Sequence, residues 1–234
     1  MTPRGFSGHP ELSTRLLEST DFEALADLRA EVLAALPDPD CYVAETDEAA
    51  FFAEHREPHG QTIGVFDAAG RLVAYAMLGL PLADTPGNLA AVTGMDDASR
   101  AACAHLSSCM VRPGWRGRGL QRTLLGARLA LAHAQGRHLC LAVVSLRNHS
   151  SRHNMLRRGL HLAWVGEIDG LRRQVAMIDL RHGLHSDPGD ERLIDSDDFD
   201  TQRQAITDGY RGVGEVRGAD DRVEWLRFWK HLEL

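Results

Sequence analysis

The sequence lacks any apolar run that approaches the roughly 18 residues a membrane-spanning helix needs, so we expect no membrane contact. The first ten residues contain Gly, Pro and His but no hydrophobic signal core, which argues against secretion by that route. The cysteines follow no framework spacing, which fits a reducing compartment. We therefore expect a cytoplasmic protein.

Acidic residues are missing from the centre of the chain. Between Ala98 and Gly166 there is no Asp or Glu, whereas Arg occurs eleven times. The rest of the chain carries all 33 acidic residues against the remaining 15 basic ones. A basic centre in a chain of net charge −7 predicts an anionic ligand that is held centrally. Nucleic acid is disfavoured, because apart from Trp115 no aromatic residue is interleaved with the arginines and the acidic flanks would repel phosphate.

A strand, a glycine turn and a helix are predicted in succession inside this basic region. His105–Val111 favours a strand, and Pro113-Gly114 ends it. From Leu120 onward, apolar residues recur at the spacing of one helix face. Between them, Gly117 and Gly119 leave backbone N–H groups free beside a helix N-terminus, which favours a phosphate or pyrophosphate.

Spacing separates the kinds of phosphate loop. A P-loop needs a lysine that this segment lacks, and a dinucleotide fingerprint needs a glycine where Arg122 stands. Arg116-Gly117-Arg118-Gly119-Leu120-Gln121 resembles the coenzyme A loop of the GNAT (GCN5-related N-acetyltransferase) superfamily, with Gln121 in place of the last small residue. An ordinary basic strand-to-helix turn is the alternative interpretation.

A second segment, Asn148–Leu160, resembles the later GNAT motif, in which Asn opens a helix that ends in Gly-Phe. Ser151, Met155 and Gly159 follow Asn148 in the register of that motif, and Leu160 stands where Phe is usual. The two motifs occur in the family's order, which strengthens the resemblance.

The resemblance implies a mixed α/β (α+β) fold, in which helices flank a twisted, mostly antiparallel GNAT-like sheet. We expect a loose tail at residues 1–12, the acetyltransferase-like domain at 13–180, and an extension at 181–234. In the extension, an acidic linker at 182–200 is followed by a helix to Asp208, capped by Ser196 or Asp198, and by a final hairpin. Its aromatic residues should pack on the domain or on a partner subunit, which allows a homodimer.

Within the domain, the patterns predict a strand and two helices, then hairpins on either side of the motifs. The expected ranges are a strand at 13–18, a helix capped by Thr20 or Asp21 that runs to 36, a helix at 46–57 capped by Thr46, and hairpins at 62–80 and 160–180. Between the first hairpin and the motifs, residues 81–104 are expected to be a connection with a short helical turn that starts at Asp96.

The resemblance implies transfer of acetyl from acetyl-CoA, a co-substrate, to an amine acceptor, with no metal. It assigns pantetheine to the backbone of Met110, Val111 and Arg112, together with Asn148. It assigns the pyrophosphate to the loop formed by Arg116, Gly117, Arg118, Gly119, Leu120, Gln121 and Arg122.

The proton-transfer groups are where the sequence departs from the family pattern. Met155 stands where a tyrosine often serves as the acid, and methionine has no proton to give, so Ser151 or His153 would have to replace it. His105 is the candidate base, because a histidine titrates near neutrality. Zinc held by Cys103, His105 and Cys109 is disfavoured, since one strand cannot aim all three at one ion.

Three functions therefore remain open. The first is a cytoplasmic GNAT-like N-acetyltransferase. The second is a GNAT-fold module that binds acyl-CoA without efficient turnover, and the third, on the arginines alone, is a nucleic-acid-binding module.

Overall fold

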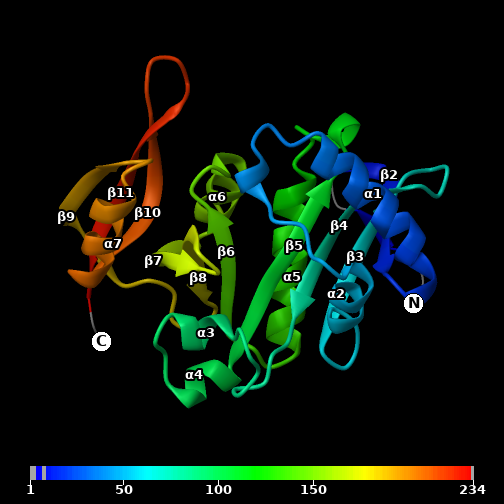
Figure 1. The fold of residues 1–234 in the computed structure, drawn as a ribbon, viewed down its shortest axis with the longest axis horizontal. Coiled ribbons are helices and arrows are strands. Elements are labelled where there is room, and N and C mark those ends of the chain that lie inside the picture. The colour runs from blue at the N-terminus through cyan, green and yellow to red at the C-terminus, as the bar shows by residue number, and fades with distance from the viewer. Residues whose placement is uncertain (1–3, 7–8, 233–234) are drawn as a thin grey trace.

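The computed structural model describes residues 4–6 and 9–232, and in this part of the chain a single mixed sheet of 11 strands forms the centre of the molecule (Figure 1). Neighbouring strands follow the order β1-β2-β3-β4-β5-β6-β8-β7-β10-β11-β9. The strands are β1 Arg4–Phe6, β2 His9–Leu16, β3 Gly60–Phe66, β4 Leu72–Gly79, β5 Cys103–Val111, β6 Leu139–Ser145, β7 His161–Ile168, β8 Leu171–Asp179, β9 Ser186–Asp195, β10 Tyr210–Arg217 and β11 Val223–His231.

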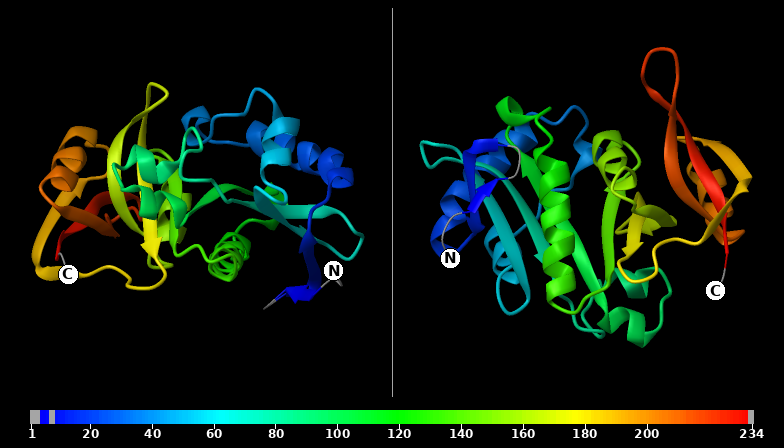
Figure 2. Two further views of the ribbon diagram at one scale, coloured as in Figure 1. Left: turned by 90° about the horizontal axis from the view of Figure 1, so that it is seen from below. Right: turned by 180° about the vertical axis from the view of Figure 1, so that it is seen from behind.

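Helices cover both faces of this sheet. Helices α1 to α4 lie on one face, and α5 lies on the other (Figure 2). The helices are α1 Phe22–Ala34, α2 Glu48–Glu54, α3 Leu89–Val92, α4 Asp97–Ala101, α5 Leu120–Ala134, α6 His149–Leu156 and α7 Phe199–Thr207, with short 3-10 turns at Ser19–Asp21, Pro39–Cys41 and Pro113–Trp115. None of the helices in the described ranges is long and apolar enough to cross a membrane.

Each face of the sheet has its own hydrophobic core, because side chains alternate along a strand. Tyr75 and Met77 of β4 pack under α1 and α2. Ala74 and Ala76 of the same strand pack with Leu124 of α5 on the opposite face. The sheet is thus buried on both sides where β3, β4 and β5 run through its centre.

The strands β5 and β6 are parallel, and they separate soon after they meet. They pair only from Cys103 with Leu139 to His105 with Leu141. All other neighbouring strands of the described sheet are antiparallel. Beyond His105 the facing edges of β5 and β6 are therefore unpaired, and a gap opens in the sheet.

A bulge in β5 lies beside this gap. Ala76 of β4 pairs with Cys109, but Leu78 pairs with Leu106, so β5 carries an extra residue over this stretch. Arg128 of α5 stabilises the bulge, because its buried guanidinium donates to the Ser107 carbonyl at 3.0 Å. The extra residue turns the side chains of Ser107 and Ser108 toward the same face, where they bond His55 and Tyr75 respectively.

The C-terminal unit, β9 to β11 with α7, continues both the sheet and the core. β10 joins β7 where Gly212 lies opposite Leu162, and a Cβ on Gly212 would lie within 3.0 Å of that side chain. One hydrophobic cluster runs from α5 through Met155 to Leu226 and Phe228 of this unit. A buried ion pair, Arg152 Nε to Glu215 Oε1 at 3.0 Å, ties α6 to β10.

Most of the predicted elements are confirmed. The first helix, the three hairpins, the strand before the glycine turn and the helix after Asn148 form where the patterns indicated. Asp198 caps α7 by accepting from the Thr201 N–H. The expected mixed, mostly antiparallel sheet flanked by helices is also confirmed.

Four expectations need correction. The acidic stretch 182–200 is not only a linker, because β9 pairs with β11 at the edge of the sheet, where exposed acids, Pro188 and Gly189 are tolerated. Asp47, and not Thr46, caps α2. The connection from 81 to 104 contains α3 as well as the expected turn after Asp96. β1 and β2 occupy part of the tail expected at 1–12, while residues 1–3 and 7–8 lie outside the described ranges.

Candidate functional site

The glycine turn has the backbone that its sequence predicts. Gly117 and Gly119 have φ values of +77° and +76°, in the left-handed region where residues with a Cβ are strained. Gly119 is the N-cap of α5, so the first N–H groups of that helix are left without side-chain partners. No acidic residue lies in the first turn of α5, and the turn can therefore receive an anion.

A cavity of about 740 Å³ extends from this turn toward the gap between β5 and β6. Its walls come from the end of α1, the Pro39–Cys41 turn, the end of β5, the glycine turn and the start of α6. The predicted ligand-binding residues that line it are Met110, Val111, Arg116, Gly117, Gly119, Leu120, Gln121, Arg122, Asn148, Ser151 and His153. Arg112, Arg118 and His105 do not line it.

The backbone donors that face the gap differ from the predicted ones. The Arg112 N–H donates to the Val73 carbonyl at 3.0 Å, toward β4. Because N–H directions alternate along an antiparallel pair, Met110 also points toward β4, whereas Cys109 and Val111 point into the gap. Of the three predicted backbone donors, only the Val111 N–H therefore points into the gap. The Cys109 N–H also points there, although the motif did not indicate it.

Two of the predicted arginines are occupied elsewhere. The Arg112 side chain is buried, and it donates to the Leu72 carbonyl and to the carboxylates of Asp27 and Glu31 on α1. This contact lowers the pKa of Asp27 by stabilising its anion. Arg118 stacks over the Trp115 ring, 4.5 Å from its centroid. Arg116 and Arg122 are the arginines of the turn that line the cavity.

The start of α6 forms the wall opposite the glycine turn. Asn148 caps the helix by accepting from the Ser151 N–H at 3.1 Å, and it donates to the Cys41 carbonyl at 3.2 Å. Gln121 accepts from Asn154 at 2.7 Å and donates weakly to the Ser151 hydroxyl at 3.4 Å. Asn148 thus holds the connection between α1 and α2 against α6 at the cavity. Gln121 links the start of α5 to α6.

The two candidate acids have different surroundings. The Ser151 hydroxyl lines the cavity and donates to no described residue. His153 donates from Nδ1 to Glu215 at 2.9 Å, which commits that nitrogen to the C-terminal unit. Met155, in the position of the family tyrosine, is buried in the hydrophobic core and fills apolar space there.

His105, the predicted base, does not reach this cavity. Its Nε2 accepts from the Leu89 N–H at 3.0 Å, which caps the first turn of α3. Burial lowers its pKa to about 4. A neutral ring whose lone pair already accepts a hydrogen bond is poorly suited to take a further proton, so this placement argues against the role of base.

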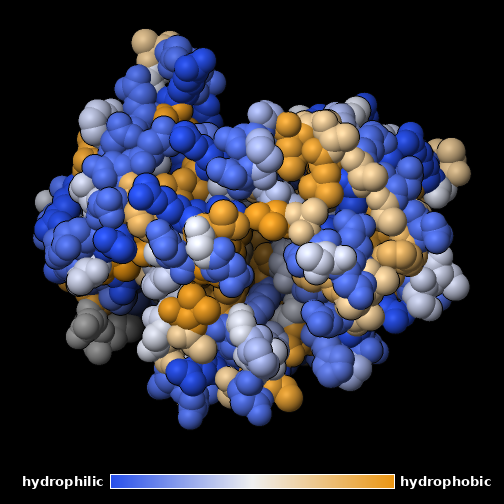
Figure 3. All heavy atoms as spheres, viewed as in Figure 1, coloured by the Kyte–Doolittle hydropathy of each residue, from blue (hydrophilic) through white to orange (hydrophobic). Residues whose placement is uncertain are grey.

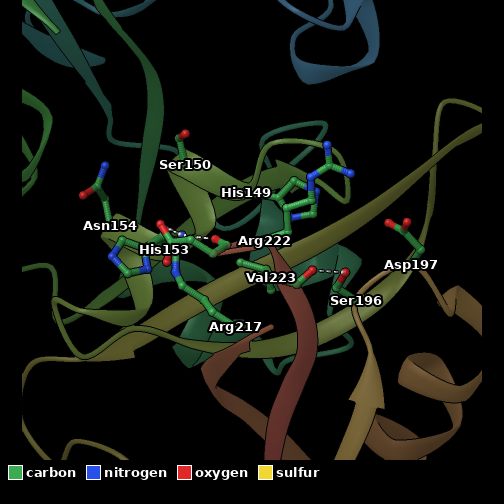
Figure 4. A pocket seen from close by; sticks show the side chains of 10 residues that line it. His149, Ser150, His153, Asn154, Ser196, Asp197, Arg217, Arg222 and Val223 are labelled. Carbon is green, nitrogen blue, oxygen red and sulfur yellow. Dashed lines mark hydrogen bonds and ion pairs between the residues drawn. The ribbon is translucent and has the colours of Figure 1, made fainter. Parts of the chain in front are cut away.

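A second cavity of about 620 Å³ lies on the other side of α6, against the C-terminal unit (Figure 4). Its lining residues are His149, Ser150, His153, Asn154, Ser196, Asp197, Arg217, Asp221, Arg222 and Val223. Positive and negative side chains are mixed around it, and Arg217 and Arg222 already pair with Asp221 and Asp220 at 3.3 Å. His149, Ser150, His153 and Asn154 of α6 line both cavities and separate them.

On the α1–α4 face, the molecule is hollowed over the gap between β5 and β6 (Figure 3). Val143 of β6 lies on this face opposite Val175 and is 38% exposed, which is unusual for a central strand. Beside the gap, Arg29 of α1 is buried and donates to Tyr75 at 2.7 Å and to Glu48 at 2.9 Å. Arg29 thereby holds both helices on the strands next to the hollow.

Sequence reasoning missed Arg29, His55 and Ser107 on this face. The three come from α1, the end of α2 and the bulge, and no local spacing relates them. Among the described residues, no group of three or more His, Cys, Asp or Glu side chains is arranged to hold a metal ion.

An open sheet gap, a glycine turn at a helix N-terminus and a connecting cavity define a protein of the coenzyme A-binding acetyltransferase class. The family model described as "Acetyltransferase (GNAT) family" matches residues 22–160. The chain belongs to the GNAT family and is by that membership an N-acetyltransferase, which confirms the resemblance found in its motifs.

Solved structures share this fold. A GCN5-related N-acetyltransferase from Kribbella flavida is 20% identical with a TM-score of 0.53, over 73% of this chain and 98% of the other. The Salmonella typhimurium protein yncA, solved with its cofactor acetyl-CoA, is 20% identical with a TM-score of 0.53, over 76% and 98%. The ribosomal-protein-S5-alanine acetyltransferase from Vibrio fischeri is 12% identical with a TM-score of 0.57, over 78% and 99%. No protein with curated annotation matches the chain.

Proposed function

We propose that this protein transfers the acetyl group of acetyl-CoA to a primary amine of an acceptor whose identity the test below addresses. The observation that carries the proposal is the cavity that joins the glycine turn to the gap between β5 and β6. A ligand with a pyrophosphate at one end and a slender arm can bind the turn and still reach the gap. The proposal includes acetyl-CoA as co-substrate and involves no metal.

The turn supplies the charge for the pyrophosphate. Arg116 and Arg122 line the cavity beside the free N–H groups at the start of α5, where the helix dipole also favours an anion. The arm would follow the unpaired edge of β5, with Cys109 and Val111 offering backbone donors. Donors fixed in a strand stabilise the charge that develops on a thioester oxygen, because they need no reorganisation.

The acceptor would enter from the hollow on the α1–α4 face, opposite the turn. There the attacking nitrogen could reach a thioester held in the gap, while the acyl group stays shielded by the sheet. The acidic residues of α2 and the turn before it, Glu45, Asp47, Glu48 and Glu54, would attract a cationic amine by their long-range field. Ser151 is the better-placed of the proposed acids, because its hydroxyl hydrogen is uncommitted.

The test is release of free thiol from acetyl-CoA with three amine probes: tyramine, putrescine and a tripeptide with N-terminal alanine. We expect at least one probe to consume thioester at a rate that saturates with both substrates, with a mass gain of one acetyl group on the probe. Tight binding of acetyl-CoA without any thiol release from the three probes would instead support the alternative, a GNAT-fold binding module.

A further inference from the structure

Two polar side chains meet where β5 leaves β6, on the hollowed face. Ser107 is the next residue on this face beyond the last β5–β6 pair, that of His105 with Leu141. Its half-buried hydroxyl lies 2.8 Å from Nε2 of His55, which ends α2. The pair thus lies beside the unpaired stretch of β5. Neither side chain lines the cavity of the glycine turn, but Ser107 is two residues from Cys109, which does.

The hydrogen-bond partners define which nitrogen of His55 carries the hydrogen. Nδ1 lies 2.8 Å from the Phe51 carbonyl oxygen, which can only accept. Nδ1 therefore carries the hydrogen, Nε2 holds the lone pair, and the Ser107 hydroxyl donates to it. The Phe51 ring packs against the imidazole with centroids 4.5 Å apart, so the ring orientation is held from two sides.

His105 lies close by but is engaged differently. Around the bare Cα of Gly79, a Cβ would lie 3.4 to 3.6 Å from the His105 side chain, His55 Nε2 and Ser107 Oγ. The lone pair of His105 caps α3 through the Leu89 N–H. A proton placed there would break that cap, whereas a proton placed on His55 Nε2 keeps the bond to Phe51.

We propose that Ser107 and His55 form a relay that removes the proton from the amine acceptor. This inference rests on the acetyl transfer proposed above. An ammonium acceptor gives a proton to the Ser107 oxygen as the Ser107 hydrogen passes to His55 Nε2. The freed lone pair of the nitrogen attacks the thioester carbon and the carbon–sulfur bond breaks. A second proton from that nitrogen neutralises the thiolate, and the imidazolium then releases its proton to solvent.

The charges that face His55 set how the relay responds to pH. Burial lowers the pKa of His55, and the bond to Phe51 partly opposes this. Glu54 on the same helix favours the imidazolium, while Arg29 of α1 opposes it. His105 of β5 also faces His55, but burial lowers the pKa of His105 to about 4, so it carries no charge at pH 7. His55 is thus neutral and ready to accept at pH 7, and the acid limb of kcat/KM should fall below pH 6.5.

The test uses the full chain and whichever of the three amine probes reacts fastest. His55→Gln and Ser107→Ala should each lower kcat by about 10²–10⁴-fold at pH 7, with the KM for acetyl-CoA unchanged. In both variants the pH profile of kcat/KM should lose its acid limb and depend only on the ionisation of the amine probe. Ser107→Thr keeps the hydroxyl and should restore most of the rate. His105→Gln tests the alternative base, and this variant should keep the acid limb of the pH profile.

Loss of the acid limb with His105→Gln alone, or rates within threefold of wild type for both relay variants, would overturn the relay while leaving acetyl transfer intact. A wild-type protein that acetylates none of the probes would overturn the proposed function and the relay with it. If a variant does not fold, nitrogen NMR of the wild-type imidazole decides. A hydrogen on Nδ1 supports the relay, and a hydrogen on Nε2 in the resting protein rejects it.

Discussion

At the scale of single residues, the arginines of the basic region have distinct roles although the sequence presents them as one cluster. Arg112 and Arg128 are buried and hold strands and helices together. Arg116 lines the cavity, and the only described hydrogen bond of its side chain is a long one of 3.4 Å to the Val111 carbonyl. Its charge is therefore available to a ligand.

Replacing Arg116 by Ala should weaken coenzyme A binding by about 1.5–3 kcal/mol, the contribution of a charge-assisted hydrogen bond. Calorimetry measures the change. Arg157→Ala is the matched control, because Arg157 is exposed and lines neither cavity. Equal affinities for wild type and Arg116→Ala would remove this side chain from the pyrophosphate site.

The glycines of the turn give a second prediction at this scale. Gly119→Ala should destabilise the free protein by about 1–2 kcal/mol, because φ is +76° there, and should also lose the melting shift that coenzyme A produces. Gly136→Ala is the control: its φ is +73° and nothing lies within 4 Å of the new Cβ. It should lose similar stability yet keep the full melting shift. If both variants keep the shift, the turn does not hold the cofactor.

At the scale of elements, the Asn148 side chain makes two hydrogen bonds at the start of α6, one to the Ser151 N–H and one to the Cys41 carbonyl. Asn148→Ala should cost about 0.5–2 kcal/mol through the lost cap, and should raise the KM for acetyl-CoA because the bond to Cys41 that closes the cavity is lost too. Asp198→Ala removes the corresponding cap of α7, far from the turn, and should change stability alone. Asn148→Asp keeps a cap acceptor but has no donor for Cys41. An unchanged KM in Asn148→Asp would show that the closure has no effect on binding.

At the scale of the whole molecule, the C-terminal unit positions α6, one wall of the larger cavity, as well as extending the sheet. Arg152 of α6 is fully buried, and Glu215 of β10 is only 4% exposed. Because α6 carries one side of the cavity, a loss of this pair should affect both folding and binding.

Glu215→Gln should lower the free energy of unfolding by about 3–5 kcal/mol, because it leaves the charge of Arg152 buried without a counterion. Urea denaturation measures this loss. Asp221→Asn breaks the exposed pair with Arg217 and should cost about 0–1 kcal/mol. A similar small cost for both substitutions would mean that Arg152 reaches water after all and that the unit does not anchor α6.

Local patterns were sufficient for most of the elements and for the glycine turn. Gly117 and Gly119 predict the turn because their positive φ values are a property of single residues. Asp198 and Asn148 predict helix starts because a cap spans only three residues. Two short motifs were therefore enough to predict the glycine turn and the start of α6, which both line the larger cavity.

The tertiary structure decided the rest. Ser107 meets His55 only because β5 bulges beside β4 and α2 packs over it, which depends on register and burial across 52 residues of chain. β9 looked like a linker because its acids are exposed, and its strand exists only through backbone bonds to β11. His105 was predicted as a base from its chemistry alone, but packing against α3 had already committed its lone pair to Leu89. The sequence by itself determined the local backbone and the glycine turn, because both depend on neighbouring residues alone. Contacts between distant elements decided which polar side chains remain free to react.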